Sequence, residues 1–140
     1  MVNGMKRLLP LCALPLTVFL GGCSKPPQVQ NLVGEWTGPD GAQVTLMGNS
    51  TFVAHGLPFQ IFDNPVQSGA PISGSGEWKV AGRRVSGWEV QLSFSEEDGV
   101  PSRRGVRINV SSDDDVYGLF QWVDEEGGSR YTFTKGLKSK

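Results

Sequence analysis

The feature of this sequence that most restricts its fold is an alternation of apolar and polar residues with a period of two. It is clearest at residues 88–94 (WEVQLSF), where every second residue is apolar. Successive side chains of a β-strand point to opposite faces, so this pattern buries one face of a strand and leaves the other in water. Residues 106–110 and 131–133 repeat the pattern, and the sequence therefore predicts a β-rich domain.

The alternating segments are separated by short polar turns, such as residues 96–99 (EEDG) and 124–128 (DEEGG). Strands joined by such turns are antiparallel neighbours, and the 19 Gly and 9 Pro of the chain suit many turns better than long helices. We predict seven or eight strands, at 33–37, 42–47, 51–55, 76–81, 85–95, 103–111, 115–123 and 129–135. The sequence thus predicts an all-β antiparallel meander over 33–136, closed into a small barrel, with a β-sandwich as the alternative.

One connection breaks this rhythm. Residues 56–76 form a stretch rich in Gly, Pro and Ser, and connections longer than about 12–15 residues are uncommon in compact domains and often functional. Apolar side chains lie near its start, at Leu57, Phe59, Ile61 and Phe62. We expect them to form a short strand or a flap over one end of the barrel, and we take them as the candidate contact surface for a ligand or partner.

The segment 116–123 (VYGLFQWV) is unusual because it is apolar on both faces. A strand buried on both faces lies centrally in a sheet or under a covering segment. We therefore expect this strand to be central or to lie under a covering loop.

The amino-terminal segment has the organisation of a secretion signal. Two basic residues precede the apolar run 8–20, which at 13 residues is shorter than the roughly 20 residues of a membrane span. Residues 20–23 (LGGC) follow and resemble the lipobox of bacterial lipoproteins, in which a signal peptidase cleaves before a cysteine that carries diacylglycerol. The resemblance implies that Cys23 is the lipid-bearing first residue of the mature protein. An ordinary cleaved signal with a cysteine nearby is the alternative.

This interpretation divides the rest of the chain and predicts its location. Residues 1–22 would be removed, residues 23–32 would form an extended polar tether, and residues 137–140 would form a short tail. The acylated chain would lie on the outer side of a bacterial membrane, in the cell envelope. If the cell has an outer membrane, Ser24 after the cysteine resembles the signal for delivery to it. The sequence leaves open whether Met1 or Met5 is the start.

The sequence shows no convincing catalytic set. His55 is the only histidine and no Gly-x-Ser-x-Gly sequence occurs, whereas a serine nucleophile needs a histidine oriented by a carboxylate. Asp113–Asp115 lack the spacing of a calcium loop and are interpreted as a solvated turn. A net charge of −1 with short basic pairs gives no footprint for nucleic acid. We therefore predict no enzyme activity, catalytic residue, metal or cofactor, and no nucleic-acid partner.

The first half of the domain resembles a known family. Residues 33–36 (VGEW), 44–46 (VTL) and 50–52 (STF) are similar to the opening strands of lipocalin-like lipoproteins. Residues 74–78 (GSGEW) resemble a later strand of small bacterial lipoproteins of this kind. The resemblance implies a lipocalin-like barrel that can hold a small apolar ligand, with Trp36 packing structurally at the closed end.

These observations lead to a functional expectation. The chain is expected to be a membrane-anchored, non-enzymatic binding module for a small apolar ligand or for a partner in the envelope. The alternative is an inhibitor or immunity lipoprotein that blocks an enzyme by protein contact. Acidic turns at one end of the meander, at 96–98 and 124–126, could then attract a basic partner. A purely structural lipoprotein and an unfamiliar enzyme are further alternatives.

Overall fold

The structure is a computed structural model that describes residues 25–62, 69–83, 86–113, 116–124 and 128–136. The predicted signal segment, Cys23, the possible start residues and the tail 137–140 lie outside the described residues, as do parts of the long connection and of two acidic turns.

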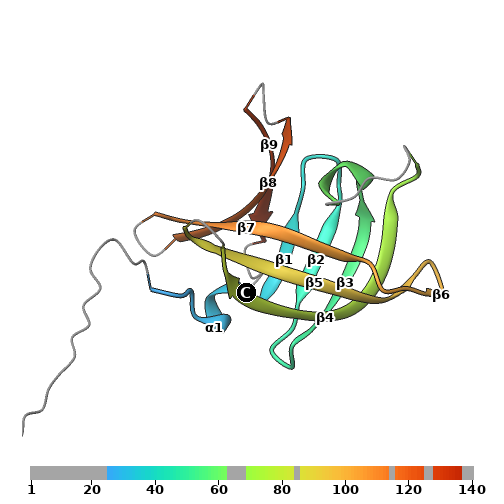
Figure 1. The fold of residues 1–140 in the computed structure, drawn as a ribbon, viewed down its shortest axis with the longest axis horizontal. Coiled ribbons are helices and arrows are strands. Elements are labelled where there is room, and N and C mark those ends of the chain that lie inside the picture. The colour runs from blue at the N-terminus through green and yellow to red at the C-terminus, as the bar shows by residue number, and fades with distance from the viewer. Residues whose placement is uncertain (1–24, 63–68, 84–85, 114–115, 125–127, 137–140) are drawn as a thin grey trace, which may run out of the picture.

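The described chain is almost entirely β-strand (Figure 1). The strands are β1 (Gly34–Thr37), β2 (Gln43–Leu46), β3 (Thr51–Leu57), β4 (Ile72–Gly82), β5 (Trp88–Glu97), β6 (Val100–Pro101), β7 (Gly105–Asp113), β8 (Val116–Asp124) and β9 (Ser129–Lys135). A four-residue helix, α1 (Val29–Leu32), precedes β1, and a 3-10 turn, η1 (Phe59–Ile61), follows β3.

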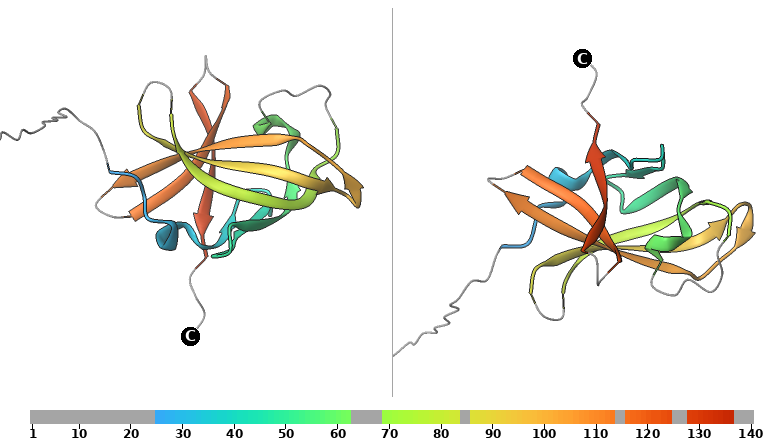
Figure 2. Two further views of the ribbon diagram at one scale, coloured as in Figure 1. Left: turned by 60° about the horizontal axis from the view of Figure 1, so that its bottom comes forward. Right: turned by 90° about the horizontal axis from the view of Figure 1, so that it is seen from above.

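The strands form one antiparallel sheet that closes on itself (Figure 2). Each barrel strand pairs with its neighbour in the chain, β4 pairs with β5, and β9 returns to pair with β1. The barrel has eight strands, and β6 is an additional short strand beside the end of β5. The prediction of an all-β meander closed into a barrel is confirmed, and the alternative of a β-sandwich is not observed.

The alternating strand directions define two ends of the barrel. At one, here called the α1 end, lie α1, the carboxyl end of β9 and the connections β2–β3, β4–β5 and β7–β8. At the other, here called the far end, lie the connections β1–β2, β3–β4, β5–β7 and β8–β9. The two acidic turns after β5 and β8 therefore share the far end, as a simple meander predicts, while the turn after β7 lies at the α1 end.

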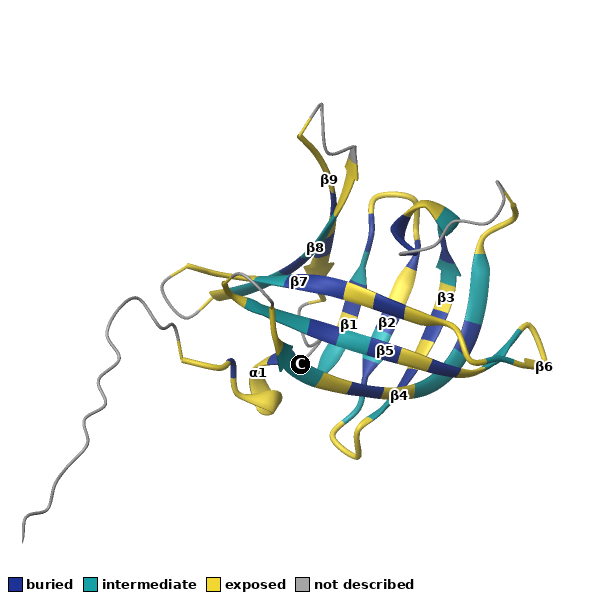
Figure 3. Cartoon of the chain, viewed as in Figure 1, coloured by how far each residue is buried: buried dark blue, intermediate teal, exposed yellow. Residues whose placement is uncertain are grey.

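The alternation in the sequence becomes the division between core and surface (Figure 3). Val90, Leu92 and Phe94 of β5 are buried, and their inward partners on β7 include Val106 and Ile108. Trp36 is buried, and its indole Nε1 donates a hydrogen bond to the carbonyl oxygen of Leu32 at 2.8 Å. This bond fastens α1 across the α1 end of the barrel, and the structural role implied for Trp36 fits this position.

The predicted extended tether is wrong at its carboxyl end. Residues Val29–Leu32 form α1, and both Pro27 and Leu32 are buried against the barrel. The Nζ of Lys135 donates a hydrogen bond to the carbonyl oxygen of Asn31 at 2.8 Å. A composition rich in polar residues and proline suggested an extended chain, but burial of these two apolar residues holds the segment onto the domain.

Tyr131 occupies an unusual position on the inner face of β9. Its side chain is 6% exposed, and a Cβ placed on Gly38 would lie 2.4 Å from its hydroxyl oxygen, so the β1–β2 turn closes directly over the ring. Among the described residues the hydroxyl has no hydrogen-bond partner. Burial raises the pKa of Tyr131 above its ordinary value of 10.0, and the Asp40 carboxylate adds to the rise. The backbone of Asp40 partly opposes this rise.

Replacing Tyr131 with phenylalanine is expected to raise the free energy of unfolding by about 1 kcal/mol at neutral pH, because it removes a buried hydroxyl that lacks a partner. When the pKa of a group is higher in the folded state than in the unfolded state, its protonated form stabilises the fold. This stabilisation is fully present below the unfolded-state pKa and is lost as the pH rises through the folded-state pKa. The free energy of unfolding of the wild type should therefore fall above about pH 10. The free energy of unfolding of Tyr131→Phe should fall less over the same pH range. Urea unfolding at neutral and alkaline pH measures both effects, with the half-buried Tyr117→Phe as the control. Destabilisation by Tyr131→Phe at neutral pH would contradict this account.

Candidate functional site

The residues proposed from the sequence as a contact surface are mostly in the core. Leu57, at the end of β3, is buried, as are Ile61 in η1 and Phe62 directly after it. Phe59 is half-buried. Three of the four residues therefore belong to the core and form no exposed surface in this structure. Contact of these residues with a ligand inside the barrel stays a prediction.

The segment after β3 folds inward because its Phe62 ring packs against the Phe94 ring inside the barrel. Two glycines of β4 leave the space that the Phe94 ring occupies. Gly74 and Gly76 face the interior, and a Cβ on Gly74 would lie 2.9 Å from the ring of Phe94. The Phe94 ring fills this space, with its centroid 5.0 Å from that of Phe52 and 5.8 Å from that of Phe62. Aromatic pairs at such distances pack favourably, so Phe62 closes the far end of the barrel as part of an aromatic cluster.

An arginine holds this closure from outside. The guanidinium carbon of Arg104 lies 5.3 Å from the centroid of the Phe62 ring, and its Nε lies 3.2 Å from Oε1 of Glu97. The Ser102 hydroxyl also donates a hydrogen bond to Glu97. The acidic turn after β5 is thus partly neutralised by this ion pair, which weakens its case as a docking surface for a basic partner.

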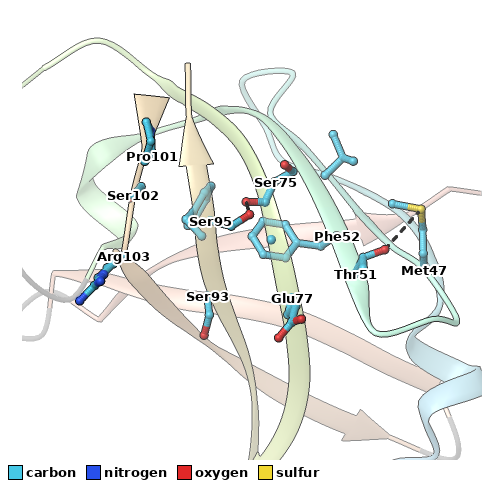
Figure 4. Close-up of a pocket in the computed structure, with 13 residues that line it drawn as sticks. Met47, Thr51, Phe52, Ser75, Glu77, Ser93, Ser95, Pro101, Ser102 and Arg103 are labelled. Carbon is cyan, nitrogen blue, oxygen red and sulfur yellow. Dashed lines mark hydrogen bonds between the residues drawn. The ribbon is translucent and has the colours of Figure 1, made fainter. Parts of the chain in front are cut away.

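A groove of about 910 Å³ crosses the outer face of β3, β4 and β5 (Figure 4). Its floor carries small polar side chains, Ser75, Ser93 and Ser95, and the Oγ of Ser95 donates a hydrogen bond to the Ser75 carbonyl at 3.2 Å. Glu77 and Arg103 also line it. The groove offers hydroxyls and one charge of each sign, and it contains no histidine that could activate a serine.

His55 lies on β3 with an exposed side chain. Its Nδ1 is 3.4 Å from the Oγ of Ser73, and that oxygen accepts a hydrogen bond from the backbone N–H of Gly56 at 2.9 Å. This contact secures the bulge where the β3–β4 register shifts. Among the described residues, no three side chains of His, Cys, Asp or Glu gather as a metal site would require.

The β8–β9 hairpin provides a different surface at the far end. Ladder pairing between β7 and β8 begins at Asp113 and Val116 and ends at Asn109 and Phe120. Beyond that point β8 leaves β7, and the hairpin stands out from the barrel wall (Figure 1). In the gap, the Nε2 of Gln121 donates a hydrogen bond to the carbonyl oxygen of Ile61 at 3.1 Å.

The outer face of this hairpin carries an aromatic–arginine cluster, formed by Phe120, Trp122 and Arg130. The guanidinium carbon of Arg130 lies 4.5 Å from the Phe120 ring centroid and 4.6 Å from that of Trp122. The two rings meet edge to face, with centroids 5.6 Å apart. Trp122 is 37% exposed and the adjacent Val123 is 40% exposed. The guanidinium is therefore held by two ring faces on an exposed apolar surface.

This cluster adds to what was expected for the segment 116–123. The expected central position is observed, since β8 lies between β7 and β9 in the sheet, and η1 also contacts β8, with a hydrogen bond from Gln121 to the Ile61 carbonyl. The outer face of β8 stays open, with Val116 exposed as well as Trp122. The only sequence signal for this surface was the apolar character of the outward-facing residues of β8. The cluster itself becomes visible from the cross-strand pairing of Trp122 with Arg130.

Comparison with known proteins gives no family assignment, since no family model, no curated protein and no solved structure matches this chain. In the part of the chain that the structure describes, no helix is long and apolar enough to cross a membrane.

Proposed function

We propose that this protein is a lipid-anchored, non-enzymatic binding module that holds a partner protein in the bacterial envelope. The anchor is the acyl group on Cys23, which the lipobox-like residues 20–23 support. The binding surface is the aromatic–arginine cluster of Phe120, Trp122 and Arg130. The observation that carries the proposal is that this cluster is exposed on a hairpin that stands out from the barrel at the far end.

The composition of the cluster favours a protein partner. Trp and Arg are over-represented among the residues that dominate binding energy at protein interfaces. A guanidinium fixed between two rings has lost much of its rotational freedom before binding, so it offers its N–H donors to a carboxylate at a reduced entropic cost. The surface therefore suits a partner that presents an acidic side chain next to apolar ones.

A partner fits the structure better than a small apolar ligand. The side chains that the sequence offered for a ligand, Leu57, Ile61 and Phe62, pack into the core, and Phe62 belongs to the aromatic cluster at the far end. The inhibitor alternative uses the same surface, with the bound partner being an enzyme whose activity falls on binding.

The proposal is tested by photo-crosslinking in cells that carry the full-length chain. With benzoylphenylalanine in place of the exposed Thr132, which pairs with Phe120 on the outer face of the hairpin, we expect a discrete crosslinked adduct, and none with the same group at the exposed Lys79 on the outer face of β4. In the Thr132 crosslinker background, Trp122→Ala and Arg130→Ala should each strongly reduce the adduct. Loss of either side chain should weaken binding of the identified partner about 30-fold, the equivalent of about 2 kcal/mol.

Two controls separate the parts of the proposal. Cys23→Ser should move the protein out of the membrane fraction, and unchanged membrane association would contradict the anchor. Arg130→Ala should change the free energy of unfolding by less than about 1 kcal/mol, as expected for an exposed cation–π contact, so loss of the adduct cannot be attributed to unfolding. Equal adducts at positions 132 and 79 would contradict the binding surface.

A further inference from the structure

The chain enters the folded domain very soon after the proposed lipid site. Pro27 is already buried, and α1 begins at Val29. Four peptide units separate Cys23 from Pro27. A chain spans at most about 3.3–3.6 Å per residue, so the acylated sulfur and the α1 end of the barrel are joined by no more than about 14 Å of backbone.

The barrel is longer than this connection. β4 has 11 residues, which at about 3.3 Å per residue span roughly 36 Å. With the tilt of about 35–45° that small barrels require, the wall is roughly 25–30 Å high. The far end therefore lies well beyond the reach of the tether when the α1 end faces the bilayer.

The charges of the described residues differ between the two ends. Among the connections and the outermost two residues of each strand, the α1 end carries as many cations as carboxylates: Lys25, Arg83 and Lys135 against Glu35, Glu89 and Asp113. The far end carries three cations against five carboxylates: Arg103, Arg104 and Arg130 against Asp40, Glu96, Glu97, Asp98 and Asp124. An anionic lipid surface attracts basic groups within about a Debye length and repels acidic ones. Val29, at the start of α1, is 46% exposed and adds an apolar contact.

We infer that the α1 end rests on the phospholipid headgroup layer and that the far end, with the aromatic–arginine cluster, points away from the membrane. This inference rests on the proposed acylation of Cys23 and deepens it by assigning the surface that meets the bilayer. The tether length keeps the α1 end close, and the charge difference disfavours an inverted or sideways orientation. A partner is therefore met from the aqueous side, with its contact surface about a barrel height above the lipid.

The orientation is tested with single fluorescent labels on the full-length, lipidated protein. The chain has two cysteines, Cys12 and Cys23; the first would leave with the signal and the second would be acylated, so an introduced cysteine can be labelled alone. Val29→Cys marks the α1 end and Val100→Cys marks the far end. Both positions are exposed, with Val100 at 62%, so both labels should be tolerated. The protein is placed in vesicles of phosphatidylethanolamine and phosphatidylglycerol that contain a headgroup-nitroxide lipid.

The label at position 29 is expected to be strongly quenched by the nitroxide and the label at position 100 to be nearly unquenched. Lys25→Glu with Arg83→Glu should reduce this difference without releasing the protein from the vesicles. If the protein floats with the vesicles but both labels are quenched equally, or position 100 more, the orientation is wrong while the anchor stands. If the lipidated preparation fails to float, the anchor is wrong and the orientation fails with it. Flotation and quenching are read separately, so the two failures are distinguishable.

Discussion

Replacing Gly76 with alanine is expected to lower the free energy of unfolding by about 3 kcal/mol or more, the upper range for an overpacked core. A Cβ at this position would lie 1.9 Å from the carbonyl oxygen of Ser93 and 2.9 Å from the Cα of Phe94. Both are backbone atoms of β5, so relief requires the β4–β5 ladder to open where its register shifts. A loss of this size is a large part of the roughly 5–15 kcal/mol that stabilises a small domain.

Urea denaturation of the purified protein measures this effect, and Gly48→Ala is the matched control. Gly48 lies in the β2–β3 turn, and a Cβ there would have no neighbour within 4 Å. The control should therefore stay within about 0.5 kcal/mol of the wild type. If Gly76→Ala were as stable as Gly48→Ala, the close approach of β4 and β5 would be wrong.

Replacing Trp36 with alanine is expected to lower the free energy of unfolding by about 3–5 kcal/mol. The side chain is 1% exposed, its Nε1 donates to the Leu32 carbonyl, and the Nζ of Lys135 lies 5.8 Å from its ring centroid. Its removal leaves a cavity and also releases α1 from the barrel. Trp36→Phe keeps most of the packing but leaves the Leu32 carbonyl unpaired, so it should cost about 1–3 kcal/mol.

Trp122→Ala is the control for the loss of a tryptophan from the surface. Because Trp122 is partly exposed and stands outside the core, its loss should cost less than about 1 kcal/mol. Thermal and chemical unfolding of Trp36→Ala, Trp36→Phe and Trp122→Ala measures how much each variant lowers the free energy of unfolding. Equal destabilisation at positions 36 and 122 would mean that the α1 end does not depend on the buried indole.

The strands were predictable from the sequence because each needs one apolar face, and a period of two reveals that need directly. The first part of β4, Ile72–Ser75, was the main omission. Its alternating Gly and Ser residues resemble a loop, and their strand conformation depends on Phe94, which occupies the space left by the inward glycines. Such a dependence joins residues about 20 positions apart and has no local signal.

The surfaces were harder to predict than the strands. Leu57, Ile61 and Phe62 follow no period, so the sequence could not show whether they face the interior or the solvent, and contacts with distant strands decide it. The aromatic–arginine cluster depends on the pairing of Trp122 with Arg130, next to the register shift between Trp122 and Asp124. A residue count across the turn does not reveal such a shift, so the cluster could not be assembled from the sequence.

The divergence of β8 from β7 gives the hairpin a mechanical independence that the rest of the wall lacks. Over residues 121–124 the seam contains a side-chain bond from Gln121 to Ile61 in place of a backbone ladder, and on the other side β9 meets β1 through only the last residues of the strand. Local opening of a folded protein begins where few ladder bonds must break. The described residues of the hairpin, 121–124 and 129–133, can therefore shift against the barrel while the core stays closed, and a partner can adjust the angle of the recognition surface without unfolding the domain.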